Sequence, residues 1–498
     1  MKLFLNILLL FAVSFCFGQN IDDTTFIKIY SGEDYDYAED LILTSDSHLL
    51  VVGSSSSFSE NNSSILLVKM DLFGNVIWVN TYSGDGVAEG SAIIECEDGN
   101  YLMTGISDDN EHNDYDLIAL KTDTAGNLIW TKRYGMNGWD VINDVVETDS
   151  GNYVFCGQSY YYNSPAGWLV SYNELTDNFD QSLLIEPDYE TVFNALTKDT
   201  NNNIYVAGSS INPSLQKDRD VFLQKYTYSL DSIWSVYGGR ALEEATGGVT
   251  IRKDGNVVLV GKSYNQYEEE NDPAIFIVDS ASGQLNFANY YSVTLIGMLN
   301  DVIATADSHK TAAIGTSYNS GTKYDALFVT SNEYGQFVNG TIRTSPEFDD
   351  ESSKAIVRIN NGYYLCGNSF GWSVNYSGFF LIKTDSIGEL SSLSYENIDL
   401  DTSSTITLPL SIEQHTTVVN DELSIHPNPL NREQALTVTP PAGEIVALVE
   451  LYNLKGQLIS QHSNQKTISF PEQTPTGIYI VKTTLSDGSI HRNKLVVR

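Results

Sequence analysis

The feature that most constrains the fold is a glycine that recurs at an almost constant interval. Seven short apolar runs end in this glycine, and serine usually follows within two places. The intervals between consecutive glycines are 52, 52, 51, 53, 54 and 52 residues, at Gly53, Gly105, Gly157, Gly208, Gly261, Gly315 and Gly367. A period of this length is typical of a repeat architecture in which every unit is one supersecondary motif.

Each repeat contains four strand-like runs joined by short turns. An Asp/Gly/Asn turn such as 98–100 separates the first two runs, and a Gly-Asn turn such as 126–127 precedes the fourth. Turns of this kind between alternating apolar runs indicate hairpins, so each unit is expected to be a four-stranded antiparallel meander. The fourth run carries a tryptophan in several repeats, which we interpret as packing within the blades: Trp78, Trp130 and Trp234.

Four strands cannot bury both faces of a sheet alone, whereas sheets stacked around an axis can. The sequence therefore predicts an all-β protein with a seven-bladed β-propeller over residues 24–395. An open β-solenoid or a row of separate sheets is the alternative, but solenoid repeats are shorter than this period. Residues 26–32 resemble a lone fourth strand and are expected to close the ring by pairing into the last unit, 351–395, where the run 390–395 competes for that place.

The first residues predict a secretory signal peptide over 1–18. Lys2 precedes an apolar run over 3–17, and the small residue Gly18 follows it. A membrane anchor is the alternative, but the run is short for a membrane span and contains Asn6. Beyond the signal three cysteines remain without CxxC spacing, which argues against a disulfide framework and a zinc site. No further transmembrane segment is expected.

The end of the chain differs from the rest in composition and charge. Residues 396–422 are polar and rich in Thr and Ser, which is typical of a linker. The whole chain has a formal net charge of −37, whereas residues 423–498 carry seven basic and five acidic residues. Strand-like runs in this last segment predict a small Ig-like β-sandwich over 423–498.

Four short motifs follow one another in this segment: Pro427-Asn428-Pro429, a Tyr-Asn-x-x-Gly stretch ending at Gly456, Gly477-Ile-Tyr479, and Lys494-Leu-Val. They resemble the type A C-terminal sorting domain of type IX secretion cargo. The resemblance implies that the type IX secretion machinery is a partner and that the domain is removed after passage through the outer membrane. It also implies that the protein is secreted or attached to the cell surface. A generic Ig-like module is the alternative interpretation.

The charge excludes some partners, and the motifs indicate no catalytic centre. A strongly negative protein repels phosphate backbones, so nucleic acid is not expected as a partner. The repeat region contains His48, His112 and His309, and the first and last occupy the same turn of different repeats. A metal site or catalytic triad built from them is therefore not expected. Catalytic and phosphate-binding motifs are missing too, and no cofactor is predicted.

Long, varied connections fall on one face of the predicted ring, while short, uniform turns fall on the other, so binding is expected on the varied face. Acidic residues open several repeats there, and aromatic residues occupy the loops between the second and third runs. The candidate ligand contacts are Tyr160, Tyr161, Tyr162, Tyr264, Tyr267, Trp372, Tyr376, Asp34 and Asp36. Rings beside carboxylates can stack on sugars or hold a cationic peptide. Alternatively, the rings pack between blades and the acids only keep the protein soluble.

These observations predict an exported binding or adhesion protein with a glycan or surface-protein ligand. An extracellular polysaccharide hydrolase or lyase is one alternative, which would need two carboxyl groups with different pKa values. A purely structural role at the cell surface is another. Asp followed by Ser or Thr and then by a small or aliphatic residue resembles bacterial O-glycosylation sites in four turns, although turns favour Asp-Ser anyway: 123–125, 231–233, 279–281 and 385–387.

Overall fold

The computed structural model describes residues 24–497 with several gaps, and the signal peptide predicted over 1–18 lies outside it. The gaps are 59–62, 85, 109–113, 137, 161–164, 186–189, 212–218, 241–242, 269, 292–295, 306–308, 320–322, 340–350, 361, 371–376, 393, 402–403, 409–423, 427–434, 441–444, 454–457, 464, 470–474, 476 and 487–489. Every regular element in the described ranges is a strand. Within these ranges no helix has the length and apolar character needed to span a membrane.

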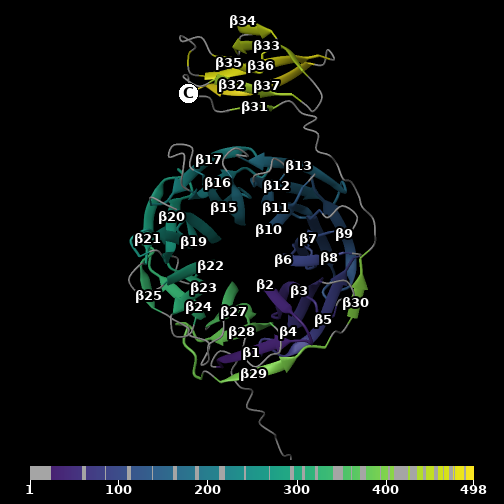
Figure 1. The fold of residues 1–498 in the computed structure, drawn as a ribbon, viewed down its shortest axis with the longest axis vertical. Helices are drawn as coiled ribbons and strands as arrows, with labels where there is room; N and C mark the ends of the chain where they lie inside the picture. The colour runs from purple at the N-terminus through teal and green to yellow at the C-terminus, as the bar shows by residue number, and fades with distance from the viewer. Residues whose placement is uncertain are drawn as a thin grey trace, which may run out of the picture. The chain divides into compact units, whose positions relative to one another are not determined.

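The described part of the repeat region forms seven sheets, and Figure 1 shows them as blades in a ring around a central opening. The predicted all-β propeller is confirmed. Within a blade, consecutive strands pair antiparallel, and the first strand lies next to the opening (Figure 1). The first three blades contain β2 (Asp36–Leu43), β3 (Leu49–Ser55), β4 (Ser64–Met70) and β5 (Val76–Ser83); β6 (Ala88–Glu95), β7 (Tyr101–Ser107), β8 (Asp116–Thr122) and β9 (Leu128–Tyr134); and β10 (Asp140–Asp149), β11 (Asn152–Ser159), β12 (Ala166–Asn173) and β13 (Asn178–Ile185).

The remaining four blades follow the same order. They contain β14 (Val192–Lys198), β15 (Ile204–Ile211), β16 (Arg219–Tyr226) and β17 (Ser232–Gly238); β18 (Glu244–Ile251), β19 (Asn256–Asn265), β20 (Glu270–Asp279) and β21 (Leu285–Tyr290); β22 (Ile296–Ala304), β23 (Thr311–Asn319), β24 (Lys323–Ser331) and β25 (Phe337–Asn339); and β26 (Glu351–Ile359), β27 (Gly362–Ser369) and β28 (Gly378–Thr384).

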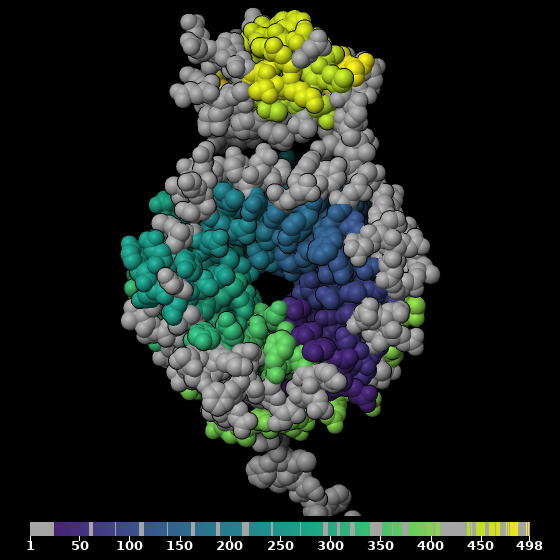
Figure 2. Space-filling view, in the orientation of Figure 1, coloured from purple at the N-terminus to yellow at the C-terminus, as the bar shows by residue number. Residues whose placement is uncertain are grey.

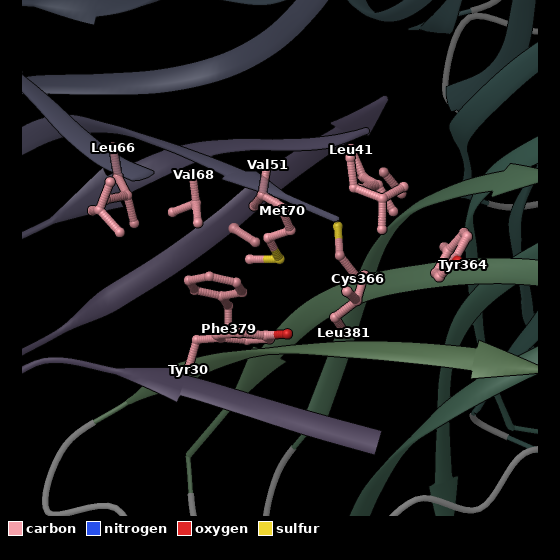
Figure 3. Close-up of a cluster of buried hydrophobic side chains, with 14 of the residues drawn as sticks. Tyr30, Leu41, Val51, Leu66, Val68, Met70, Tyr364, Cys366, Phe379 and Leu381 are labelled. Carbon is pink, nitrogen blue, oxygen red and sulfur yellow. The ribbon is translucent and has the colours of Figure 1, made fainter. Parts of the chain in front are cut away.

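The last blade is completed by the N-terminal strand. β1 (Phe26–Ser31) pairs antiparallel with β28, as the sequence predicts. Tyr30 of β1 stacks on Phe379 of β28 with ring centroids 4.9 Å apart, and its hydroxyl donates to the carbonyl oxygen of Gly74 in the first blade. Figure 3 shows Tyr30 and Phe379 inside a buried cluster built from the first and last blades, so β1 fastens the joint where the ring closes.

The segment expected to be a linker from residue 396 differs from that prediction. β29 (Tyr395–Asp399) pairs parallel with β1 and becomes the fifth strand of the last blade. β30 (Ser404–Thr407) pairs parallel with β5 and becomes the fifth strand of the first blade. The chain therefore belongs to the ring at least to Leu408, whose side chain is buried.

The repeat glycine is explained by a bulge in the first strand of each blade. The pairing of that strand with its neighbour shifts register by one residue at Glu39 in the first blade and at Asn143 in the third. The bulge brings a backbone carbonyl oxygen against the glycine, so a Cβ would lie only 1.9 Å from the oxygen of Tyr37 at Gly53 and of Val141 at Gly157. The other five glycines meet the same obstacle, at 1.9 to 2.2 Å. Only glycine fits, which fixes the period.

The C-terminal part of the chain, 415–498, is a second compact unit. It contains one sheet of β31 (Ser424–His426), β32 (Ala435–Thr439) and β35 (Thr467–Ser469) and another of β34 (Leu458–Ser463), β33 (Val446–Asn453), β36 (Gly477–Leu485) and β37 (Ile490–Val497). Leu436 and Val438 of the first sheet share a core with Val449 and Val481 of the second. Two sheets around one core agree with the predicted sandwich.

Candidate functional site

A polar channel runs through the ring, and the bulges line it. Its cavity has a volume of about 530 Å³, and Figure 2 shows its opening at the centre of the ring. The residue at each bulge contributes to the lining: Glu39, Ser91, Asn143, Asn194, Gly247, Asn300 and Lys354. Glu39 and Lys354 form an ion pair of 2.6 Å between the first and last blades. The side-chain amides of Asn143 and Asn300 each donate to a carbonyl oxygen of the next blade at 2.6 Å.

Three half-buried aspartates next to the bulges, which also line the channel, join neighbouring blades. Asp40, Asp144 and Asp301 each accept the backbone amide of the following residue and one amide of the next blade, at 2.8 to 2.9 Å for the latter. Burial raises the pKa of these carboxyl groups to about 6, 8 and 7, respectively. These ion pairs and hydrogen bonds therefore link neighbouring blades around the channel.

The long connections between blades and the loops after the second strands lie side by side on what we call the loop face. The amide of Tyr160, after β11, donates to the carbonyl oxygen of Trp139, before β10. The amide of Ser56 donates to Tyr35 in the same way in the first blade. The arrangement of connections expected from the sequence is therefore present in both blades.

One aromatic group on this face, platform A, comprises the exposed rings of Trp139 and Tyr160 and the half-buried ring of Tyr115. Trp139 is 52% exposed and meets Tyr115 edge to face, with centroids 5.4 Å apart. Asp114 accepts the amide of Gly138 at 3.1 Å, which ties the two segments together. The pKa of Tyr115 is raised by burial and by the nearby charges of Asp108 and Glu89. Platform A is thus an aromatic surface with acidic groups close by.

A second group, platform B, is formed by Tyr35, Tyr37 and Phe370. The rings of Tyr35 and Tyr37 stack with centroids 6.2 Å apart, and Tyr37 lies 6.1 Å from Phe370, which is 53% exposed. Asp34 accepts the amide of Tyr35 at 2.9 Å. Residues of the first and last blades therefore meet here, as residues of the second and third blades do in platform A.

Beneath each platform, a buried aspartate accepts hydrogen bonds from the chain segment that connects two blades. Asp36 accepts the amide of Gly32 at 2.6 Å and hydroxyls of Ser55 and Ser57. Asp140 accepts the amide of Met136, likewise four residues earlier. Asp36 and Asp140 have no exposed surface. Asp36, a candidate ligand contact from the sequence, therefore positions Tyr35 in this structure.

The other candidate contacts are placed as follows. Tyr160 belongs to platform A, Asp34 adjoins platform B, and Tyr267 is 88% exposed in the fifth blade, where Tyr264 is half-buried. Tyr161, Tyr162, Trp372 and Tyr376 lie outside the described residues. The structure thus does not bring the described candidates together at one point. Trp139, Tyr115 and Phe370 were missed by sequence reasoning, although Trp139 and Tyr35 each precede a blade-opening Asp, which is the signal that could have found them.

Two carboxyl groups do meet beneath platform A. A Cβ at Gly135 would lie 1.8 Å from Asp116 and 3.0 Å from Asp140, so both carboxyl groups line the same glycine. Arg133 forms an ion pair of 3.3 Å with Asp116, while burial and the charges of Asp116 and Asp114 raise the pKa of Asp140 to about 8. Asp116 and Asp140 are 4% and 0% exposed, so a substrate has no access to them in this structure.

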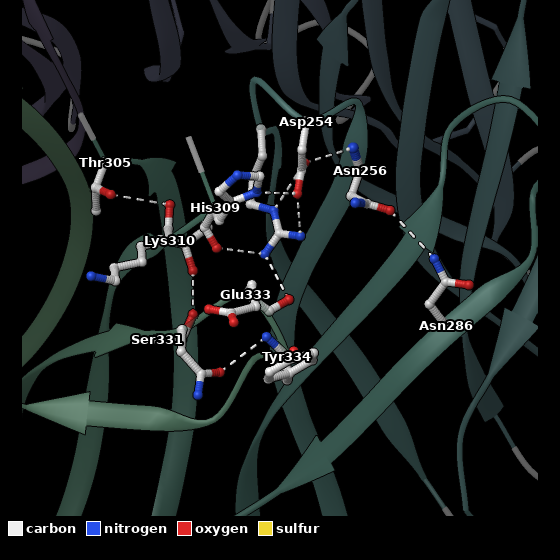
Figure 4. Close-up of polar contacts among 12 residues, drawn as sticks. Asp254, Asn256, Asn286, Thr305, His309, Lys310, Ser331, Glu333 and Tyr334 are labelled. Atoms are coloured by element: carbon white, nitrogen blue, oxygen red, sulfur yellow. Dashed lines mark hydrogen bonds and ion pairs between the residues drawn. The ribbon is translucent and has the colours of Figure 1, made fainter. Parts of the chain in front are cut away.

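Turns on the opposite face join neighbouring blades through polar contacts. In Figure 4, Asp254 bonds to the ring of His309 at 3.2 Å and to the buried Arg252, which also donates to the carbonyl oxygens of His309 and Glu333. Among the described residues no group of His, Cys, Asp and Glu is arranged to hold a metal ion. In the O-glycosylation-like turns, Asp123 accepts the amides of Ala125 and Asn127, a turn role for this aspartate.

Buried lysines on the third strands are a further set that sequence reasoning missed. Lys121 lies within 2.6 to 3.0 Å of Glu174, Asp98 and the hydroxyl of Tyr153 in the next blade. Lys69 makes the corresponding contact with Tyr101. Their positions look like ordinary surface charges in the sequence, because the tyrosine partner comes from another repeat.

Residues of the C-terminal motifs are partly described. Gly477 and Tyr479 begin β36, where Tyr479 is buried and donates to the carbonyl oxygen of Pro475 at 2.7 Å. The backbone of Lys494 in β37 pairs with that of Ile480 in β36. Pro427, Asn428, Pro429 and Gly456 lie outside the described residues. The motif from 477 onward is thus built into the four-stranded sheet.

Comparisons with solved structures find matches of low sequence identity. The chain is 12% identical to PorZ, an essential surface component of the type IX secretion system of Porphyromonas gingivalis, with a TM-score of 0.41; the match covers 94% of this chain but 60% of PorZ. The β-propeller domain of the Trilobed protease from Pyrococcus furiosus is 8% identical, with a TM-score of 0.41 and coverage of 74% of this chain and 99% of that one. An ulvan lyase of a new polysaccharide lyase family is 11% identical, with a TM-score of 0.48 and coverage of 72% and 96%. Similarity at this level indicates nothing about activity.

The decisive comparison concerns the C-terminal unit. No curated protein matches the chain as a relative. Residues 424–498 match the family of the secretion system C-terminal sorting domain, which spans β31 to β37. This domain directs export, either to attachment at the cell surface or to release. The chain is therefore a cargo protein of the type IX secretion system that carries a β-propeller ahead of its sorting domain.

Proposed function

We propose that this exported protein binds an extracellular glycan through the loop face of its propeller. The observation that carries the proposal is the exposure of the aromatic groups on this face. Trp139, Tyr35 and Phe370 are each about half exposed or more although rings are normally buried, and backbone hydrogen bonds fix Trp139 and Tyr35. Rigid exposed rings are suited to stacking on the apolar faces of sugars.

The neighbouring acidic side chains complete the surface for this role. Asp34 lies beside platform B and Asp114 beside platform A, each already oriented by a backbone amide. Carboxylate oxygens accept hydrogen bonds only, which suits sugar hydroxyls. Where export ends in attachment at the cell surface, such binding would produce adhesion.

A polysaccharide hydrolase or lyase is the second candidate, and the carboxyl pair of Asp116 and Asp140 is the feature that favours it. The raised pKa of Asp140 beside an ion-paired Asp116 resembles an acid and a base held apart. The burial of both groups favours binding over catalysis, since a general acid must reach the glycosidic oxygen.

A glycan array probed with the full chain tests the proposal when it is read for both retention and released product. We expect retention on at least one glycan and no new reducing ends or unsaturated products. Product release would establish the enzymatic alternative. An array without any retained glycan would contradict glycan binding and leave a structural role at the surface.

A further inference from the structure

Platforms A and B occupy the same position of the repeat. Tyr35 and Trp139 lie 104 residues, or two repeats, apart in the sequence. Each directly precedes a buried aspartate, and the carbonyl oxygen of each accepts an amide from the end of the second strand. The two rings therefore stand at equivalent places on the loop face, on the first and third blades, ahead of β2 and β10 in Figure 1.

Other blades make the same backbone hydrogen bond, but the residue whose carbonyl oxygen accepts it carries a different kind of side chain. In the second blade, between the platforms, the carbonyl oxygen that accepts the amide of Asp108 belongs to Val87. In the fifth blade the corresponding residue is Glu243, which accepts the amide of Tyr264. Aromatic and apolar residues thus occupy this position from the first to the third blade, which we call the arc, and a charged residue occupies it in the fifth.

The charges along the arc are acidic. Glu33 and Asp34 adjoin platform B, while Asp108 and Asp114 adjoin platform A. Two basic groups of these neighbouring blades are already held in ion pairs, Arg133 with Asp116 and, in the channel, Lys354 with Glu39. A polymer of uronic or sulfated sugars would meet like charge at both platforms, and this repulsion disfavours it.

We propose that platforms A and B bind one polysaccharide chain without acidic groups, which follows the arc and stacks on both. This inference rests on the proposed glycan binding and adds the class of ligand and the pairing of the two platforms. A polymer that reaches both platforms binds the second one intramolecularly, so its affinity exceeds that of a short fragment of the same sugar.

The test uses the full chain and uncharged probes of two lengths. The long probes are soluble mannan, laminarin and N-acetylated chitin oligomers, and the short probes are the corresponding disaccharides. Polygalacturonate is the anionic probe. For the uncharged polymer that binds, we expect an affinity on the order of 10²-fold above that of its disaccharide. Trp139→Ala and Tyr35→Ala should each remove most of this gain for the polymer, roughly tenfold or more, while each costs the disaccharide about twofold, since one platform remains.

Two variants control for altered folding and for non-specific loss of aromatic surface. Trp139→Phe keeps a stacking ring and should restore most of the affinity for the polymer. Tyr228→Ala removes a ring that is 63% exposed in the turn between β16 and β17, on the opposite face, and should leave affinity unchanged.

The outcomes separate the two levels of the proposal. If the wild-type chain binds no glycan, both the proposed function and this inference fail. If it binds an uncharged polymer but Trp139→Ala and Tyr35→Ala behave like Tyr228→Ala, the pairing of platforms fails and glycan binding stands. Tighter binding of polygalacturonate than of the uncharged polymers overturns the ligand class.

Discussion

The backbone amide of Leu408 donates a hydrogen bond of 2.8 Å to the carbonyl oxygen of Ser83 at the end of β5. Leu400 makes the same contact with Ser31 at the end of β1. Each leucine side chain is buried, Leu400 in the cluster between the last and first blades and Leu408 in the cluster between the first and second. The segment after the repeats thus uses one device twice, a short parallel strand followed by an anchoring leucine.

Loss of either anchor should weaken the ring. We expect Leu400→Ala and Leu408→Ala each to lower the free energy of unfolding by about 2 kcal/mol, because a buried leucine is truncated and leaves a cavity. Chemical denaturation of the propeller, followed by tryptophan fluorescence, measures this. Leu175→Ala, at a residue that is 93% exposed, is the matched control and should change little. Equal stability of all three variants would show that the two leucines do not contribute to the stability of the ring.

The repeat glycine should resist even the smallest substitution. Gly157→Ala places a Cβ 1.9 Å from the carbonyl oxygen of Val141, and the backbone must move to accept it. We expect a loss of roughly 3 kcal/mol, the upper end of what overpacking costs. Gly84→Ala, where a Cβ meets no atom within 4 Å, serves as the control. Thermal melting of the two variants decides the matter, and a Gly157→Ala protein as stable as Gly84→Ala would refute the bulge argument.

Buried and exposed lysines should differ in their effect on stability. Lys121→Met leaves the partly buried Glu174 and its neighbours without their cation, so we expect a loss of about 3 kcal/mol. Lys132→Met removes an ion pair with the exposed Asp177 and should cost no more than about 1 kcal/mol. Urea unfolding at low and moderate salt measures both. Similar small losses would mean that Lys121 is replaceable by an apolar side chain.

Stability should fall as the pH rises from 5 to 8.5. The folded-state pKa values of Asp40, Asp301 and Asp144, about 6, 7 and 8, lie above the roughly 4 of an unfolded aspartate. The folded protein therefore binds more protons than the unfolded chain in this range. Their stabilising contribution is complete below pH about 4 and is lost as the pH passes through the folded values.

Denaturation midpoints at constant ionic strength across this range provide the measurement. Asp144→Asn cannot titrate and should show a shallower pH dependence than the wild type, even if it is less stable overall. A wild-type midpoint that rises toward pH 8.5 would contradict the assignment of raised pKa values to these aspartates.

The features that could be predicted from the sequence are those that depend on contacts within a single repeat. The glycine period reflects a clash inside one blade, between Gly53 and Tyr37 for instance, so it survives in every copy. The contacts that were missed join different repeats. Lys121 meets Tyr153 of the next blade, and β30 pairs through its backbone, which leaves no apolar pattern in a Thr- and Ser-rich segment. The role of Asp36 was misjudged for a related reason: an acid that opens a repeat can face solvent or turn inward to its own loop, and composition does not distinguish these.

The order in which β1, β29 and β30 join the ring has a mechanical consequence. A pull on the chain beyond residue 408 reaches the propeller first at Leu408 and β30, whose four residues pair with β5, and next at β29. Only after both have been stripped away does force reach β1 and the antiparallel register that shuts the ring. Such a load would therefore strip two short parallel strands before the ring is at risk of opening.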